Sequence, residues 1–371
     1  MSKNLNFRKT ILLFFVVFVS YNLFAGSDPD TMYVQKFKNN FSVKTFLLNN
    51  GFIYTLTPRN NDNFTEQQLK DAKLFYLPHI PPTTGVSVNI KGIGFSYVFK
   101  FTNDYLDTTG RIKSGYKQFA MNMYGTKFGF EAYYQDYSRF YFHYKNQPIH
   151  LKDYNTDVRA YQWGARGIFI FNGKKFSYNA AFNQNQLQKK SAGSAMLIIA
   201  GRFSELKSTN RTLIPDSLSP YYGFTSKLQR NRNYAFLVQG GYGFNLTKNY
   251  FYFSMAALVG VGIETQTFSY PPQKYYRIGF PLVGRGKASV GYNGKILFTG
   301  IFANTDVGQA RNKSFKTQEL NYTYGVYVGV RAIKFTKTKG QIKQEEKRKK
   351  LAEKEAAKKA KEAKKKATKR K

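Results

Sequence analysis

The chain has 371 residues, with 58 Lys and Arg against 21 Asp and Glu, and a formal net charge of +37 at pH 7. It contains no cysteine, which excludes disulfides and thiol chemistry, and its three histidines offer little to a metal centre. Phe and Tyr are abundant, at 35 and 29 residues, while the hydrophobic fraction of 42% is ordinary, a balance that suits alternating strands with one aromatic face.

The N-terminal residues have the pattern of an export signal. Three cations precede an apolar run at residues 11–19, and the small residues Ala25 and Gly26 follow it. This order predicts a secretory signal peptide over residues 1–25, followed by a polar lead-in over residues 26–40. No later apolar run is long enough to cross a membrane as a helix, so a membrane-spanning form of this chain must use strands.

Residues 41–335 alternate between apolar and polar side chains with a period of two, which indicates strands. In the last strand, Tyr324 and Val328 share a face with other apolar residues, whereas Thr323 and Arg331 lie on the opposite face. One apolar and one polar face are typical of a transmembrane barrel strand, with lipid outside and a wet lumen inside. The sequence therefore predicts an all-β fold, an antiparallel transmembrane β-barrel of about 12 strands within a range of about 10–14.

Residues 159–182 carry the strongest local signal, an Asn172-Gly173 pair between two alternating runs. Both central residues of a type I′ turn need positive φ, so this pair favours a β-hairpin. The residues expected on the lipid face of that hairpin are Tyr161, Trp163, Ala165, Phe169, Phe171, Phe176, Tyr178, Ala180 and Phe182.

Two other segments interrupt the alternation. Thr65 is a candidate N-cap for a short helix over residues 65–71. Within residues 184–231, residues 195–203 alternate less cleanly and residues 205–231 are irregular. The number of strands in this region stays open, because tight turns on one side of the barrel require one crossing more or one fewer here.

Residues 336–371 form a tail rich in Lys, Ala and Glu. From Lys337 to Lys371 there are 17 Lys and Arg against 5 Glu, a local charge of +12. These residue types favour helix, and without a large apolar stripe the helix is solvated. The prediction is a basic helical tail on the periplasmic side, whose candidate partners are anionic phospholipid or a periplasmic protein. A purely solubilising tail is the alternative.

Three sequence runs resemble a known family. They are Phe-Ser-Tyr-Asn-Ala-Ala-Phe at residues 176–182, Gln-Lys-Lys-Ser-Ala-Gly-Ser at residues 188–194, and Leu-Ile-Pro at residues 213–215. The chain from about residue 30 to about residue 335 resembles an uncharacterised domain-of-unknown-function family of Gram-negative exported proteins. This resemblance implies an outer-membrane β-barrel and adds no activity.

Cations on the presumed lumen face and in one loop are the candidate binding residues. The lumen cations suit an anion-preferring pore or lipopolysaccharide phosphates, unless they pair with inward carboxylates such as Glu131 and Glu264. The loop residues suit a phosphate or a sugar, unless they form a plain strand connection, and they lack the strand and helix context of a phosphate-binding loop. The candidates are Arg166, Arg285, Lys287 and Arg331 in the lumen and Lys189, Lys190 and Ser191 in the loop.

Three functions remain open, and the sequence favours the first. The first is a non-enzymatic pore, or a structural or binding protein, with a cationic lumen. The second is an outer-membrane enzyme acting on lipid or lipopolysaccharide, for which Ser138 or Glu131 with His143 are candidates, although no nucleophile motif marks them. The third is a soluble secreted β-sandwich.

The expected location is the cell outer membrane, and it determines the candidate partners. These are outer-membrane lipid and lipopolysaccharide, with anionic solutes as a further class. Export argues against nucleic acid despite the basic charge. No residue pattern indicates a cofactor or a metal site.

Overall fold

The computed structural model divides the chain into two units, Met1–Arg331 and Ala332–Lys371. Every residue described here belongs to the first unit. The predicted signal peptide (residues 1–25) and basic tail (residues 336–371) lie outside the described residues. The structure describes residues 28–37, 41–59, 62–90, 92–100, 113–144, 154–311 and 314–331.

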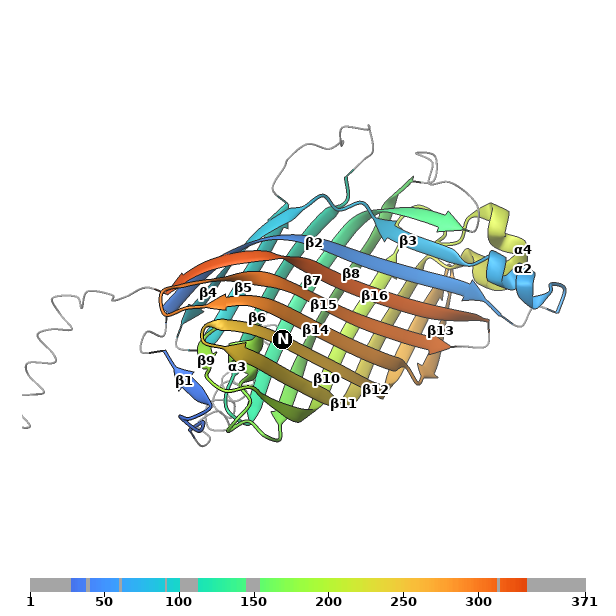
Figure 1. Cartoon of the computed structure of the whole chain (residues 1–371). Helices are drawn as coiled ribbons and strands as arrows, with labels where there is room; N and C mark the ends of the chain where they lie inside the picture. Colours follow the sequence, from blue (N-terminus) through green and yellow to red (C-terminus); the bar gives the residue numbers. More distant parts are fainter. Residues whose placement is uncertain are drawn as a thin grey trace, which may run out of the picture. The chain divides into compact units, whose positions relative to one another are not determined.

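A closed ring of antiparallel strands forms the body of this unit (Figure 1). Of the 14 strands in its sheet, all but β3 (Leu74–Pro78) and β13 (Gln273–Gly279) belong to the ring. The ring closes where β11 (Arg230–Lys248) pairs along its whole length with β12 (Phe251–Tyr270). The order is β11 (Arg230–Lys248), β10 (Ala192–Lys207), β8 (Tyr154–Ile170), β7 (Phe128–Tyr144), β6 (Gly115–Tyr124), β5 (Ile93–Lys100), β4 (Thr83–Ile90), β2 (Phe41–Pro58), β16 (Phe315–Arg331), β15 (Leu297–Arg311), β14 (Leu282–Asn293) and β12 (Phe251–Tyr270).

The ring confirms the predicted antiparallel barrel and excludes the β-sandwich. Its outer face is apolar, as the alternation predicted: Val259 is 73% exposed and Trp163 is 51% exposed. A closed ring pairs the backbone groups of every strand and leaves no sheet edge, which is the condition for crossing lipid with strands. Among the described residues, no helix combines the length and the apolar composition needed to cross a membrane.

The wall of the barrel has a step between β2 and β7. The strands β4, β5 and β6 fill this part of the wall near one end only, and β3 pairs directly with both β2 and β7 near the other end. Helix α2 (Glu66–Asp71) precedes β3 and has the predicted N-cap, because Thr65 Oγ accepts a hydrogen bond from the backbone N–H of Gln68 at 3.2 Å. The side chain of Gln68 accepts from the N–H of Thr65 at 2.8 Å, which completes a capping box.

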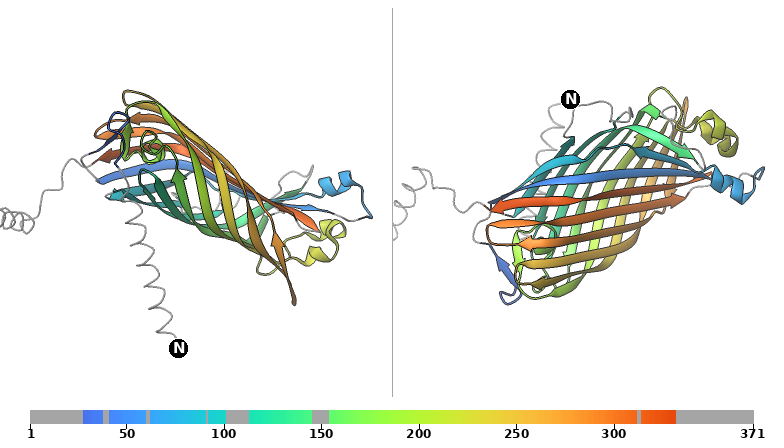
Figure 2. Two further views of the ribbon diagram at one scale, coloured as in Figure 1. Left: turned by 90° about the horizontal axis from the view of Figure 1, so that it is seen from below. Right: turned by 45° about the horizontal axis from the view of Figure 1, so that its top comes forward.

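The predicted hairpin at residues 159–182 is wrong in its second arm. β8 pairs with β10, and the intervening residues form α3 (Tyr178–Phe182) and β9 (Gln186–Gln188). β9 pairs with β1 (Val34–Lys36), which lies in the predicted lead-in. Phe176 and Tyr178, expected on the lipid face, are buried. We call residues 171–191 the insert, and Figure 2 shows α3 close to one end of the barrel.

This insert also explains the strand count in residues 184–231. The segment from residue 184 to residue 191 does not cross the barrel, whereas β10 crosses it in a single strand. Three short helices then follow before β11, which are η2 (Asp216–Leu218), α4 (Ser219–Tyr222) and η3 (Gly223–Lys227).

Gly173 lies in a close backbone approach at the start of the insert. A Cβ added there would overlap the carbonyl oxygen of Thr126. We expect Gly173→Ala to lower the free energy of unfolding by about 1–3 kcal/mol, because a backbone neighbour must move. The control is Gly201→Ala on the outer face of β10, where an added Cβ meets no atom within 4 Å. Denaturant unfolding of both variants in detergent is the measurement, and equal midpoints would contradict the close approach.

Candidate functional site in the barrel lumen

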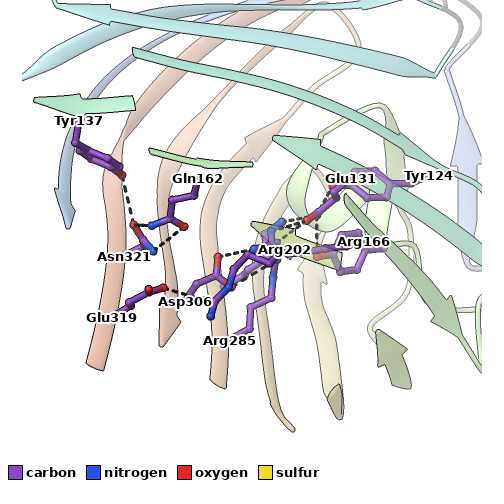
Figure 3. Close-up of polar contacts among 12 residues, drawn as sticks. Tyr124, Glu131, Tyr137, Gln162, Arg166, Arg202, Arg285, Asp306, Glu319 and Asn321 are labelled. Carbon is purple, nitrogen blue, oxygen red and sulfur yellow. Dashed lines mark hydrogen bonds and ion pairs between the residues drawn. The ribbon is translucent and has the colours of Figure 1, made fainter. Parts of the chain in front are cut away.

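Ion pairs cross the lumen between opposite walls of the barrel (Figure 3). Glu131 on β7 accepts from Arg285 on β14 at 2.6 Å and from Lys287 at 3.1 Å. Around the ring, β8, β10, β11 and β12 lie between these two strands on one side, and the remaining ring strands lie between them on the other. Arg166 approaches the same carboxylate at 3.4 Å, and Tyr124 donates to it at 2.6 Å. Glu131 is therefore the centre of a buried cationic cluster, and its charge is shared among three cations.

Three further carboxylates balance the inward arginines, and one of them is Glu264 on β12, which was expected to face inward and lies 4.0 Å from Arg202. Asp306 on β15 lies 3.1 Å from Arg166 and 3.6 Å from Arg285. Glu319 on β16 lies 3.2 Å from Arg202 on β10, again across the lumen. The predicted lumen residues Arg166, Arg285 and Lys287 thus face inward, and each is paired with a carboxylate.

Uncharged side chains bridge the lumen at other levels. The amide groups of Gln162 on β8 and Asn321 on β16 are 3.4 Å apart, and Tyr137 approaches Asn321 at 3.5 Å. Tyr54 on β2 contacts Asn231 on β11 through its hydroxyl. A cavity of about 260 Å³ remains in the lumen, and its lining includes both the Glu131 cluster and the bridge between Gln162 and Asn321. The bridges therefore narrow a single lumen space.

Apolar residues fill the lumen on both sides of these bridges. At the end where β2 begins and β16 ends, α3 brings Phe176 and Tyr178 against Ile168, Met196 and Leu258 of the wall. At the opposite end, Leu213, Ile214, Leu218 and Tyr222 from the segment between β10 and β11 pack against residues of β2, β3 and β7. The hydroxyl of Tyr222 donates to the carbonyl of Leu56 at 2.9 Å. Burial raises the pKa of Tyr222 well above its ordinary value, so this donor stays protonated.

Arg331, the fourth predicted lumen cation, faces inward, and its hydrogen bonds include one to the insert. Its guanidinium donates to the carbonyl oxygens of Gln184 and Gly294 and to Oδ1 of Asn293. It also stacks against the rings of Phe37 and Phe298, at 3.9 and 4.3 Å from their centroids. These contacts tie the end of β16 to the insert.

We expect Arg331→Met to lower the free energy of unfolding by about 1–3 kcal/mol, because buried acceptors lose their donor. Methionine keeps most of the side-chain length and its apolar contact with the rings, so the change removes the hydrogen bonds together with the charge over Phe37 and Phe298. Lys295→Met is the control, since Lys295 is exposed in the adjoining turn. Denaturant unfolding in detergent is the measurement. An unchanged unfolding midpoint for Arg331→Met would show that Arg331 does not anchor the insert.

The predicted binding loop is a strand connection. Lys189 Nζ donates to the carbonyl of Thr31 at 2.9 Å, and Ser191 Oγ accepts from the N–H of Thr247 at 3.0 Å. Lys190 lies over the ring of Tyr33, with its nitrogen 5.6 Å from the centroid. These contacts hold the β1–β9 pair on the barrel rim.

The candidate catalytic residues do not meet. Glu131 is bound by the cations described above, and Arg139, with a φ of 63°, interrupts the register of β7 between Ser138 and His143. The buried Nδ1 of His143 has no hydrogen-bond partner in the described part of the chain. The described residues also contain no group of three His, Cys, Asp or Glu side chains that could hold a metal ion.

The residues that sequence reasoning missed are Asp306 and Glu319. Both occupy inward positions, since they alternate with the outward residues Val307 and Leu320. The alternation of inward and outward side chains along β15 and β16 was therefore sufficient to place Asp306 and Glu319 in the lumen. It did not identify their partners.

Comparisons with known proteins identify a family. The model of the family described as "Domain of unknown function (DUF4421)" matches residues 28–331. The chain belongs to this family. The DUF4421 match covers the whole ring of strands and both sides of the Glu131 cluster. It confirms the family resemblance seen in the sequence.

Solved structures of several outer-membrane proteins are similar only loosely. The outer membrane protease OmpT from Escherichia coli superposes with a TM-score of 0.37 and 5% identity, over 79% of this chain and 97% of that one. The attachment invasion locus protein Ail of Yersinia pestis gives a TM-score of 0.22 and 11% identity, over 57% and 97%. The monoaromatic hydrocarbon channel TodX, as a deltaS2 mutant, gives 0.28 and 8%, over 82% and 93%. A comparison with curated proteins found no sequence match.

Proposed function

We propose that this DUF4421 protein is a non-enzymatic outer-membrane barrel with an occluded lumen, acting as a structural or binding protein rather than as an open pore. The apolar outer face supports the membrane location, because such a surface is unfavourable in water and favourable in lipid. The cross-lumen pair of Glu131 and Arg285 carries the proposal of occlusion, since it joins opposite walls at 2.6 Å.

Three of the lumen cations are already paired with carboxylates, whereas Lys44 and Arg331 have no carboxylate partner among the described residues. Arg166, Arg285 and Lys287 face Glu131 and Asp306 at 3.6 Å or less. An anion entering this space must displace a carboxylate that is already in place. Selective conduction of anions therefore has little support, and the loops and the outer surface become the candidate binding regions.

Two measurements test this proposal. Fractionation of Gram-negative cells and heat-modifiable gel migration test the location and the folded barrel, and recovery only from the soluble fraction would contradict both. Planar-bilayer recording of the full chain, with an open porin as positive control, tests the occlusion. We expect no steady conductance from folded protein, and stable steps from it would show that the lumen is open.

A further inference from the structure

A row of cations lies on the outer face of the barrel, across four neighbouring strands. Lys316 on β16 is directly opposite Arg311 on β15 and directly opposite Thr57 on β2. The register of β2 with β3 pairs Leu56 with Leu74, so Lys73 continues the row beside Thr57. Figure 1 shows β3, β2, β16 and β15 side by side, ending near α2.

These cations point outward, because their neighbours in sequence point inward. Leu74, Phe315 and Ala310 are buried in the barrel, and the residues next to them in their strands therefore face away from it. Arg59 extends the cluster by one step, since its N–H donates to the carbonyl of Ser314 at 2.8 Å. Lys316 interacts electrostatically with Arg59, Lys73 and Arg311.

Like charges directly opposite each other destabilise a sheet. Within the described part of the chain, no carboxylate forms an ion pair with Lys73, Arg311 or Lys316. This arrangement differs from that of the lumen arginines Arg166, Arg202 and Arg285, each of which has a carboxylate partner. An anion from outside the chain would relieve this repulsion.

The position of the row along the strands identifies the kind of anion. One step nearer the middle of the barrel, Gln318 donates to Gln309 at 3.2 Å on the same outer face. The next step brings the apolar residues Val307 and Leu320, and Tyr322 follows. Apolar side chains, then amides, then cations follow the depth profile from acyl chains to charged head groups.

This end of the barrel carries several long connections, whereas the opposite end carries one, the insert, together with the tight turns and the terminal strand ends. Residues 208–229 and residues 59–73 both join strands at the α2 end. In bacterial barrels the long connections face the outside and the short turns face the periplasm. The row therefore lies at the outer leaflet, whose charged lipid is the phosphorylated glycolipid lipid A.

We propose that Lys73, Arg311 and Lys316, with Arg59 beside them, form a binding site for the phosphate groups of lipid A. This inference rests on the proposed outer-membrane location and is independent of whether the lumen is closed. Lysine and arginine bind phosphate through charge-assisted hydrogen bonds, and several of them on one face engage more than one phosphate of the same lipid.

The test compares two variants of the full chain that lose equal charge. The first is Lys73→Gln with Arg311→Gln and Lys316→Gln. The control is Lys127→Gln with Lys248→Gln and Lys295→Gln, three exposed lysines at the tight-turn end. Native mass spectrometry of each protein, refolded in lipid-free detergent, measures retention of added bisphosphorylated lipid A. We expect binding about 10- to 100-fold weaker in the first variant and unchanged in the control.

Other probes separate the lipid sources. Dephosphorylated lipid A should not be retained, and phosphatidylglycerol should bind more weakly than bisphosphorylated lipid A. Equal weakening in both variants, no weakening in either, or equal retention of phosphatidylglycerol would overturn the proposal. Lys316→Gln alone, at the centre of the row, provides a milder variant if the triple variant fails to fold. Cell fractionation of the wild-type protein reports separately on the outer-membrane location.

Discussion

Glu131→Ala is expected to lower the free energy of unfolding by about 3–5 kcal/mol, because it leaves buried cations without their carboxylate. The side chains of Glu131 and Arg285 are only 10% and 5% exposed. Lys287 and Arg166 share the same carboxylate, so its loss places three like charges close together in a region with little water. Part of the loss comes from Tyr124, whose hydroxyl loses its acceptor.

Denaturant unfolding in detergent measures this effect, and the chain has a single tryptophan to report it. Trp163 lies on the outer face, so its fluorescence changes when the barrel leaves the detergent or lipid. Glu66→Ala is the control, because Glu66 pairs with Lys70 on the surface of α2, where their side chains are 83% and 61% exposed. An exposed pair contributes little, and a midpoint for Glu131→Ala no lower than that of this control would contradict the buried cluster.

A double variant separates loss of the pair from loss of one partner. Glu131→Ala with Arg285→Met removes both buried charges, and replacement of a buried ion pair by apolar side chains is often nearly neutral. We therefore expect the double variant to be less destabilised than the sum of the two single variants. Additive losses would indicate that Glu131 and Arg285 act through separate contacts.

The outer face of the barrel was predictable from the sequence, because lipid contact requires the outward side chains of every strand to be apolar. Trp163 on β8 and Tyr324 and Val328 on β16 were expected on the apolar face, and all three are exposed. A period of two places each residue inside or outside without any knowledge of its neighbours. The capped helix at Thr65 was predictable for a similar reason, since its hydrogen bonds join residues three apart.

The insert was not predictable by the same rule. Phe176 and Tyr178 alternate with polar residues as lipid-facing residues do, but they are buried against the inner wall. An apolar side chain is equally stable in lipid and in an apolar core, so the alternation did not distinguish the two. The Asn172-Gly173 pair does lie in a turn, but neither residue has the positive φ of the expected type I′ turn, and the pair does not specify the strand that follows.

The lumen pairs were unpredictable for a geometric reason. Parity places Glu131 and Arg285 inside, but they are 154 residues apart in the chain. Which inward residues meet depends on the number of strands and on their stagger around the ring. The outward row of Lys73, Arg311 and Lys316 was missed for the same reason, because it appears only when the register of four strands is known.

Phe176→Ala is expected to lower the free energy of unfolding by about 3–5 kcal/mol, since a large buried ring leaves a cavity when it is removed. Phe176 is fully buried at the α3 end of the barrel, and its ring lies over Gly243 of β11, where a Cβ would come within 3.3 Å of it. Phe171→Ala is the control, because Phe171 begins the insert but is 62% exposed and contacts only Phe169 among the rings described. We expect a loss of about 1 kcal/mol or less for the control.

The same two variants also distinguish which feature occludes the lumen. The bridges at Glu131 and at Gln162 do not involve Phe176, although Tyr178 of α3 approaches Glu131 at 3.5 Å. Folded Phe176→Ala protein is therefore expected to show no steady conductance in a planar bilayer, although it unfolds more readily. Steady conductance from this variant, with silence from Phe171→Ala, would assign the occlusion to the insert and leave the ion pairs a purely stabilising role. Loss of stability without conductance would assign the occlusion to the charges that join the opposite walls.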